Sequence, residues 1–286
     1  MVKSLIAIAL LTASYSAVAA PEVVASGLSF PEGTIFVGNT LYMVDYSASS
    51  VYRLVSGKLE KVWHQDGCGA NGLVPLKDDL LVACYDAGTL VRISTDGKVQ
   101  ETLSSDDAGH PFANPNDLAT DALGGVYFSA SGDGKVFYRA ASGHLSQAAE
   151  GINYSNGLVV SPDQKHLYVA ESREHRLLSY TITAPGKLDD KQVFIDLPHA
   201  LADGQHNEFT PDGVRIDSHG HLFVGLYQGG GIAVFGNDGK LLKKVSLPAP
   251  YHSNLAISPD ESSVYVTSTD DAGNGQLLKI GNPMKG

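Results

Sequence analysis

The stretch NPNDLATDALGGVYFS, residues 114–129, contains the opening of a unit that recurs along the chain. The polar pair Asn116 and Asp117 stands before a short apolar strand pattern, a turn rich in Asp and Gly, and a β-branched and aromatic strand pattern. Six segments align on this unit, and they begin at Pro31, Ala70, Pro115, Ser155, Pro211 and Ser253. Internal similarity at this spacing indicates a repeat architecture.

Each unit has the pattern of an antiparallel meander. In the fourth unit the strand patterns are GLVVS (157–161), HLYVAE (166–171) and RLLSYTI (176–182), and a poorer fourth strand follows in most units. The units carry equivalent polar residues at Glu32, Asn71, Asn116, Asn156, Asp212 and Asn254, which are 39, 45, 40, 56 and 42 residues apart. This spacing is close to that of a four-stranded propeller blade. The sequence therefore predicts an all-β, six-bladed β-propeller with four-stranded antiparallel blades.

The two ends of the chain are expected to complete one blade together. The sixth unit ends after QLLKI (276–280) without a fourth strand, whereas PEVVAS (21–26) has a strand pattern and no unit of its own. We expect residues 22–26 to pair into the last blade, which closes the ring and removes an exposed edge. Residues 20–286 would then form one propeller domain, with PHALADGQHNEFT (198–210) as a loop over one face.

Residues 1–19 have the pattern of a secretory signal peptide. Lys3 precedes an apolar run over residues 5–11, and Ala17-Val18-Ala19 has the small-x-small form of a cleavage site. The apolar run is shorter than the roughly 20 residues that a membrane-spanning helix needs. We therefore expect a periplasmic or secreted protein with no membrane span once the signal is removed.

The cysteines and the net charge limit the redox state of the chain and the class of partner that it can bind. Cys68 and Cys84 either form a disulfide or stay free, and the strand pattern LLVACYD (80–86) around Cys84 favours a buried free thiol. The formal net charge of −11, with no basic stripe, excludes nucleic acid as a partner. A chain with this negative charge is better suited to bind a cation than a polyanion.

The repeat places a ring of oxygen ligands at one mouth of the central channel. The innermost strand of each blade lines the channel, so the starts of these strands face one another. The six equivalent positions hold two carboxylates and four amides and no Lys or Arg, which suits Ca²⁺ or a similar hard cation. Asn and Asp also begin strands after turns, and a polar ring can simply hydrate a channel. Glu32 is poorly explained as a turn residue, and a second carboxylate nearby would repel it without a cation.

Three histidines are placed near the predicted mouth. His110 precedes the third inner strand, His206 lies in the long insertion, and His252 stands two residues before Asn254. Each either overhangs the channel or is a solvated loop residue, and the second placement is the commoner one.

The chain resembles the gluconolactonase, regucalcin and lactonohydrolase family of six-bladed propellers, and more distantly paraoxonase and diisopropylfluorophosphatase. The likeness runs from about residue 31 to residue 280 and is most specific in PEG (31–33), NPNDLATDALGGVYF (114–128), SNGLVVSPDQKHLYVAES (155–172) and PDGVRIDSHGHLFV (211–224). It implies that one divalent cation is held by Glu32, Asn156 and Asp212, with Asn116 near both metal and substrate. Ca²⁺ is expected first, with Zn²⁺, Mn²⁺ or Mg²⁺ as alternatives.

Two departures bear on this resemblance. Animal regucalcins carry an Arg that helps to hold a sugar lactone, and this chain has Asn114 at that position. Gly33 stands where paraoxonases supply a second acid, so the resemblance implies a single ion in the channel.

The resulting hypothesis is a metal-dependent lactonase that acts on a small-molecule lactone. Asp212 is the candidate general base, Asn116 and Asn114 are candidates for substrate binding, and His110 and His206 are weaker candidates for proton transfer. The alternatives are a secreted propeller that binds or scaffolds and holds a structural channel ion, or organophosphate hydrolysis at the same site.

Overall fold

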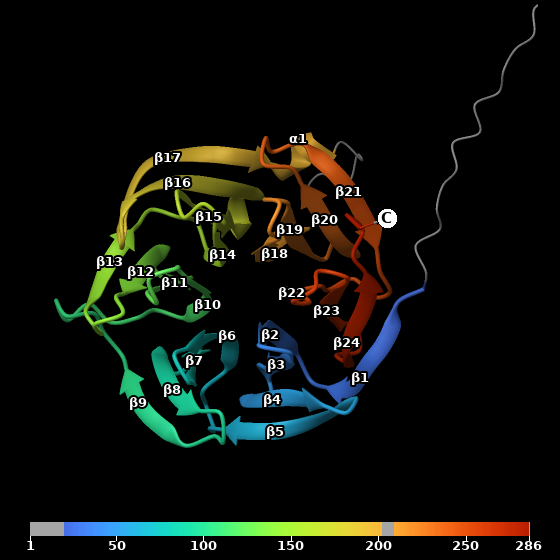
Figure 1. The fold of residues 1–286 in the computed structure, drawn as a ribbon, viewed down its shortest axis with the longest axis horizontal. Coiled ribbons are helices and arrows are strands. Elements are labelled where there is room, and N and C mark those ends of the chain that lie inside the picture. The colour runs from blue at the N-terminus through green and yellow to red at the C-terminus, as the bar shows by residue number, and fades with distance from the viewer. Residues whose placement is uncertain (1–19, 202–208, 286) are drawn as a thin grey trace, which may run out of the picture.

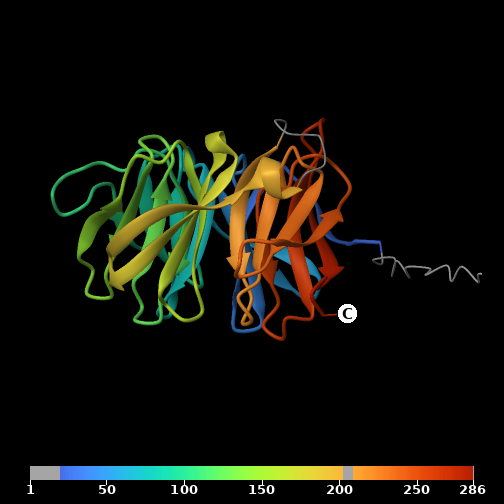
Figure 2. The same cartoon turned by 90° about the horizontal axis from the view of Figure 1, so that it is seen from above.

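The computed structural model describes residues 20–201 and 209–285. These residues form six four-stranded antiparallel sheets, which are arranged as blades around the axis of the predicted channel (Figure 1). Seen edge-on, the strands run between the two faces of a disc, and loops lie on both faces (Figure 2). The predicted six-bladed β-propeller is confirmed. The predicted signal peptide, residues 1–19, and His206 lie outside the described residues and stay predictions.

The strands are described most simply by their distance from the channel. The innermost strands are β2 (Pro31–Val37), β6 (Ala70–Leu76), β10 (Pro115–Thr120), β14 (Ser155–Val160), β18 (Thr210–Ile216) and β22 (Leu255–Ile257). The second strands are β3 (Thr40–Asp45), β7 (Asp79–Cys84), β11 (Val126–Ala130), β15 (His166–Glu171), β19 (Leu222–Tyr227) and β23 (Ser263–Thr269). The third strands are β4 (Ser50–Val55), β8 (Thr89–Ser94), β12 (Lys135–Arg139), β16 (Arg176–Ala184), β20 (Gly231–Phe235) and β24 (Gly275–Gly281). The outer strands are β5 (Lys58–His64), β9 (Val99–Leu103), β13 (Leu145–Ala149), β17 (Lys187–Asp196), β21 (Leu241–Ser246) and β1 (Glu22–Leu28).

The N-terminal strand closes the ring as the sequence predicts. β1 pairs antiparallel with β24, with Glu22 opposite Lys279 and Leu28 opposite Gly275 (Figure 1). The strand reaches two residues beyond the predicted 22–26. The last blade is thus built from both ends of the chain, and its third strand is not left as an open edge.

Apolar side chains fill the interfaces between neighbouring blades. In one of six such clusters, Val44 and Trp63 of the first blade pack with Leu80 and Val82 of the second. Another joins Leu28 of β1 to Leu41 and Met43 of the first blade, across the closure of the ring. Each blade therefore buries its two faces against its neighbours, which fixes the blades around the channel.

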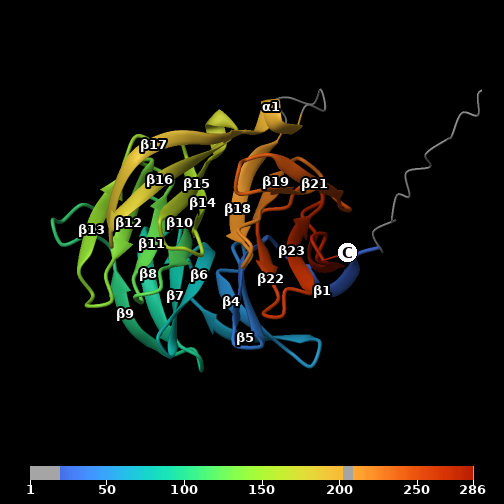
Figure 3. The ribbon, with the colours of Figure 1, turned by 45° about the horizontal axis from the view of Figure 1, so that its top comes forward.

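Two local expectations need correction. Cys68 and Cys84 form a disulfide, with their Cα atoms 4.5 Å apart, and are not free thiols. The pairing of β6 with β7 places Ala70 opposite Cys84 and so brings the two sulfurs together. The insertion is not all loop, because it begins with the helix α1 (Leu197–Leu201) after β17 (Figure 3). Leu197 and Leu201 enter the apolar cluster between the fourth and fifth blades.

No helix in the described part of the chain is long and apolar enough to cross a membrane.

Candidate active site at the channel mouth

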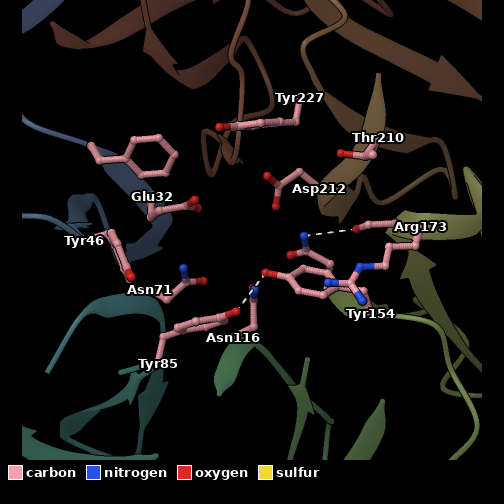
Figure 4. A pocket seen from close by; sticks show the side chains of 13 residues that line it. Glu32, Tyr46, Asn71, Tyr85, Asn116, Tyr154, Arg173, Thr210, Asp212 and Tyr227 are labelled. Atoms are coloured by element: carbon pink, nitrogen blue, oxygen red, sulfur yellow. Dashed lines mark hydrogen bonds between the residues drawn. The ribbon is translucent and has the colours of Figure 1, made fainter. Parts of the chain in front are cut away.

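Five of the six equivalent strand starts converge on one cavity at the channel mouth. The cavity has a volume of about 420 Å³. It is lined by the predicted positions Glu32, Asn71, Asn116, Asn156 and Asp212 (Figure 4). Asn254, the sixth position, does not line it. The repeat therefore predicts the location of the site and most of its polar floor.

A shared backbone irregularity directs these five side chains. In each of the first five blades, the pairing of the innermost strand with the second strand shifts register around the site residue, for example between Pro31 and Thr34 and between Pro211 and Val214. β-Bulges of this kind re-aim side chains near functional sites. In the last blade the innermost strand begins at Leu255, and its pairing runs without a shift. The register shift is thus absent in the one blade whose equivalent residue, Asn254, does not line the cavity.

Glycines after the site residues let the inner strands approach one another closely. Gly72 lies against the carbonyl oxygen of Asn116, and Gly157 lies against that of Asp212. A Cβ atom at either position would collide with that backbone. Close approach of the inner strands keeps the acid and amide groups of different blades within one small cavity.

Two buried carboxyl groups dominate the electrostatics. The exposed fractions of Glu32 and Asp212 are 5% and 8%. Burial raises the pKa of Glu32 well above its usual range, and the charges of Asp212 and Asp117 raise it further. The pKa of Asp212 is also raised well above its usual range, first by burial and then by Asp117. A cation between the two carboxyl groups would relieve both effects.

The side-chain amide of Asn156 is held by its nitrogen, and its oxygen accepts no hydrogen bond. Its Nδ2 donates to Oγ of Ser172 over 3.2 Å, and that hydroxyl donates to the carbonyl of Pro211 over 2.7 Å. These bonds hold the amide in one orientation, whereas its Oδ1 is buried with no hydrogen-bond partner. A buried, unpartnered oxygen beside two carboxyl groups fits a hard cation.

Acids and histidines alone do not make a metal site here. In residues 20–201 and 209–285, no cluster of three or more His, Cys, Asp or Glu side chains has the arrangement of a metal site. The cavity supplies two carboxyl groups, and the remaining oxygen ligands would be amides. This donor set suits Ca²⁺ better than a metal that prefers imidazole or thiolate.

Aromatic side chains form the wall of the cavity, and the sequence reasoning missed them. They are Phe30, Tyr46, Tyr85, Tyr154 and Tyr227 (Figure 4). The hydroxyl groups of Tyr85 and Tyr154 are hydrogen-bonded over 2.9 Å, and burial is the first cause of the raised pKa of Tyr154. Tyr46 and Tyr85 each follow the second strand of their unit. This equivalent position in the first two units is a signal that could have found these two tyrosines, whereas Phe30 and Tyr154 directly precede innermost strands.

One positive side chain lines the cavity. Arg173 belongs to the 3₁₀ turn η1 (Ser172–Glu174), and its guanidinium group lies 5.0 Å from the centre of the Tyr154 ring. Its neighbour Glu174 is engaged elsewhere, with the side chain of Asn153. The lining of the cavity thus includes a positive charge beside Tyr154 as well as the two carboxyl groups.

Three other residues predicted for the site or its mouth, Asn114, His110 and His252, do not line the cavity. Asn114 donates from Nδ2 to the carbonyl of Tyr85 over 3.1 Å, so it contacts the backbone of a wall residue. His110 lies 2.9 Å from Asp106 and is half exposed. His252 is fully buried, and its Nε2 donates to the carbonyl of Pro248 over 3.1 Å.

The fold and the site together define a six-bladed propeller with an acid-and-amide site at one mouth of its channel. Residues 30–270 match the family described as the SMP-30/gluconolactonase/LRE-like region. The chain belongs to this family.

Relatives of this chain have names that refer to lactones. The pentonolactonase of Haloferax volcanii is 25% identical over 210 residues, which cover 71% of this chain and 68% of that protein. The gluconolactonase of Zymomonas mobilis is 25% identical over 283 residues, which cover 87% of this chain and 78% of that protein. The structure of a gluconolactonase from Xanthomonas campestris shares the fold, with a TM-score of 0.77, 21% identity and coverage of 90% of this chain and 88% of that one.

Proposed function

We propose that this protein is a divalent-cation-dependent lactonase, which hydrolyses a cyclic ester to the open hydroxy acid. The observation that carries the proposal is the pair of buried carboxyl groups, Glu32 and Asp212, which share one cavity with the unpartnered amide oxygen of Asn156. Membership of a family with relatives named lactonases supports the same reaction class.

The cation-binding residues of the proposal are Glu32, Asn156 and Asp212, with Asn116 beside them in the cavity. Oxygen ligands favour Ca²⁺, and Mg²⁺, Mn²⁺ or Zn²⁺ are alternatives. When bound, the cation supplies Lewis-acid polarisation of the lactone carbonyl and stabilises negative charge on its oxygen.

Asp212 is the general base of the proposal. Its carboxylate takes a proton from the water whose oxygen attacks the carbonyl carbon. As the bond between the carbonyl carbon and the ring oxygen breaks, that proton passes to the ring oxygen, and the product is a hydroxy acid. Asp212 lines the cavity and is 8% exposed, so its carboxylate lies beside the space that substrate and water would occupy.

Asn116 carries the substrate-binding part of the proposal because its side chain lines the cavity. Asn114 would act through Tyr85, whose carbonyl accepts its amide hydrogen. His110 stays a proposal for proton transfer from outside the cavity wall, and His206 stays one in the long insertion. The aromatic wall would pack against the apolar face of a lactone ring.

We also propose that the protein works in the periplasm or outside the cell. The signal-peptide pattern of residues 1–19 supports this location. The disulfide between Cys68 and Cys84 supports it as well, because disulfides persist in oxidising compartments.

The test is acid release measured in a pH-stat with a panel of aldonolactones. Protein treated with a chelator should be inactive, and Ca²⁺, Mn²⁺ or Zn²⁺ should restore turnover. Opening of at least one lactone with this cation dependence is the expected result. Bound cation without acid release from any lactone would contradict the proposal and favour a binding or scaffold protein. Fluoride release from an organophosphate fluoride in the same assay would reveal the other alternative.

A further inference from the structure

One arginine bridges four inner positions of the propeller across the channel. Arg215 lies on β18, three residues after Asp212, and its side chain is only 13% exposed. Its Nη1 donates to Oδ2 of Asp117 on β10 over 2.8 Å. Its Nη2 donates to Oδ1 of Asn254 over 2.9 Å, and it lies 3.5 Å from the carbonyl of Thr34 on β2. A single guanidinium group therefore joins the first, third, fifth and sixth blades.

The partner carboxylate is fully enclosed. Asp117 is 1% exposed, and both of its oxygens face Arg215, with Oδ1 at 3.3 Å from Nη2. Oδ1 also accepts the backbone N–H of Leu118 over 2.9 Å. Asp117 directly follows Asn116 of the proposed site, so the ion pair fixes the strand that presents Asn116. A planar guanidinium group is suited to holding a carboxylate by two bonds.

The same arginine explains why the sixth equivalent position is missing from the cavity. Oδ1 of Asn254 accepts hydrogen bonds from Arg215 and from the backbone N–H of Leu255, each over 2.9 Å. It also lies 3.4 Å from both the N–H and the hydroxyl of Thr34. The amide oxygen of Asn254 is therefore committed to Arg215 and cannot serve as a ligand at the channel mouth.

We infer that Arg215 is a positioning residue of the site and the fixed cation of the inner channel. It holds Asp117 and Asn254 away from the cavity and leaves one place, at the mouth, for an exchangeable cation. Its charge balances Asp117, so the affinity of the mouth for a divalent cation depends on the pair. This last part rests on the proposed function.

The test is a double-mutant cycle over Arg215→Met, Asp117→Asn and the double variant, with Arg215→Lys as the variant that keeps the charge. Calorimetric titration with Ca²⁺ measures binding at the mouth. Loss of the nearby positive charge in Arg215→Met should tighten Ca²⁺ binding on the order of tenfold. Asp117→Asn should weaken it, and the double variant and Arg215→Lys should bind nearly as the wild type does. The wild type and Arg215→Lys should bind one Ca²⁺ per chain.

Arg92→Met is the matched control. Arg92 pairs with Asp79 over 2.6 Å on the second and third strands of the second blade, away from the channel. Its replacement also removes an arginine–aspartate pair, and Ca²⁺ binding should not change. Equal Ca²⁺ affinity in Arg215→Met, Asp117→Asn and the wild type would overturn the inference, because a purely structural brace would lower stability without a signed change in binding.

Urea unfolding in the presence of chelator tests the coupling of Arg215 to Asp117 separately from the proposed function. Arg215→Met leaves the carboxylate of Asp117 buried without its partner, so its midpoint should fall further than that of the double variant. Strictly additive losses would overturn the inference. If the wild type binds none of Ca²⁺, Mn²⁺ and Zn²⁺, the proposed cation site fails, while the unfolding cycle still tests the role of Arg215.

Discussion

The two acids of the cavity show how single residues acquire a function from their surroundings. Glu32 and Asp212 come from the first and fifth blades, and each is buried where the charge of another carboxylate raises its pKa. A cation bound between the two carboxyl groups would oppose both shifts, because it stabilises the charged form of each group. Asn156, with its buried and unpartnered oxygen, adds a neutral ligand that does not increase this repulsion.

The buried imidazole of His252 links the stability of the fold to pH. Burial lowers its pKa from 6.5 to about 4, so the folded state binds its proton only at lower pH than the unfolded chain does. The unfolded chain therefore gains protons on this histidine first, and acid destabilises the fold. The stability associated with the neutral imidazole is fully present above pH 6.5 and is lost as the pH falls toward 4. The shift corresponds to roughly 3 kcal/mol.

We predict that His252→Gln flattens the dependence of the free energy of unfolding on pH between 6.5 and 4, measured by urea denaturation. His219→Gln, at an exposed histidine, is the control and should keep the wild-type dependence. An unchanged slope in His252→Gln would show that another group is responsible for acid sensitivity.

The sequence predicted these residues unequally, for physical reasons. Glu32 and Asp212 were predictable because the repeat fixes which strand starts face the channel. Asn254 has the same position in its unit, yet its side chain is turned away by Arg215. Arg215 binds it through contacts between blades that are far apart in sequence, and no pattern within one unit contains that information.

At the scale of elements, the pairing of β6 with β7 places the disulfide of the protein next to two residues of the cavity. The disulfide joins Cys68, just before β6, to Cys84, the last residue of β7. Asn71 and Tyr85, which follow these positions closely, both line the cavity. The strand pattern around Cys84 indicated burial correctly, but a disulfide depends on the distance between two strands, which a pattern in one strand does not contain.

Removal of this disulfide by Cys68→Ala and Cys84→Ala together should lower the free energy of unfolding by about 3 kcal/mol, as expected for a closed loop of roughly 15 residues. Urea denaturation with and without dithiothreitol measures the effect. The reductant should destabilise the wild type to the level of the double variant and should leave the double variant unchanged. A wild type that is insensitive to reductant after full reduction of the bond would contradict this.

At the scale of the whole molecule, the ring depends on both ends of the chain. β1 covers the edge of β24, and Leu28 joins the apolar cluster that links the last blade to the first. The ring was predictable because the strand deficit of the sixth unit matched an unassigned strand near the N-terminus. The helix α1 in the insertion was less predictable from the sequence. It is stabilised by packing on the next blade, which a local pattern does not contain.

A protein that begins at Ser29, and so lacks β1, should melt at a lower temperature and associate through the exposed edge of β24. Light scattering coupled to size-exclusion chromatography and thermal melting measure both effects. A protein that begins at residue 20 is the control and should be as stable as the full chain. A synthetic peptide of residues 20–28 should restore part of the lost stability, and a monomer with unchanged melting would refute the role of β1.

The most direct measurement is the rate of lactone opening by Asp212→Asn. The exchange keeps the size of the side chain and removes the carboxylate that the proposal uses as ligand and base. Asp238→Asn, at an exposed acid in the turn between β20 and β21, is the control. We predict that Asp212→Asn lowers kcat in the pH-stat by a factor of about 10² to 10⁴, the usual share of a general base. Its circular dichroism and melting should remain those of a folded propeller. Wild-type turnover in folded Asp212→Asn would contradict the account.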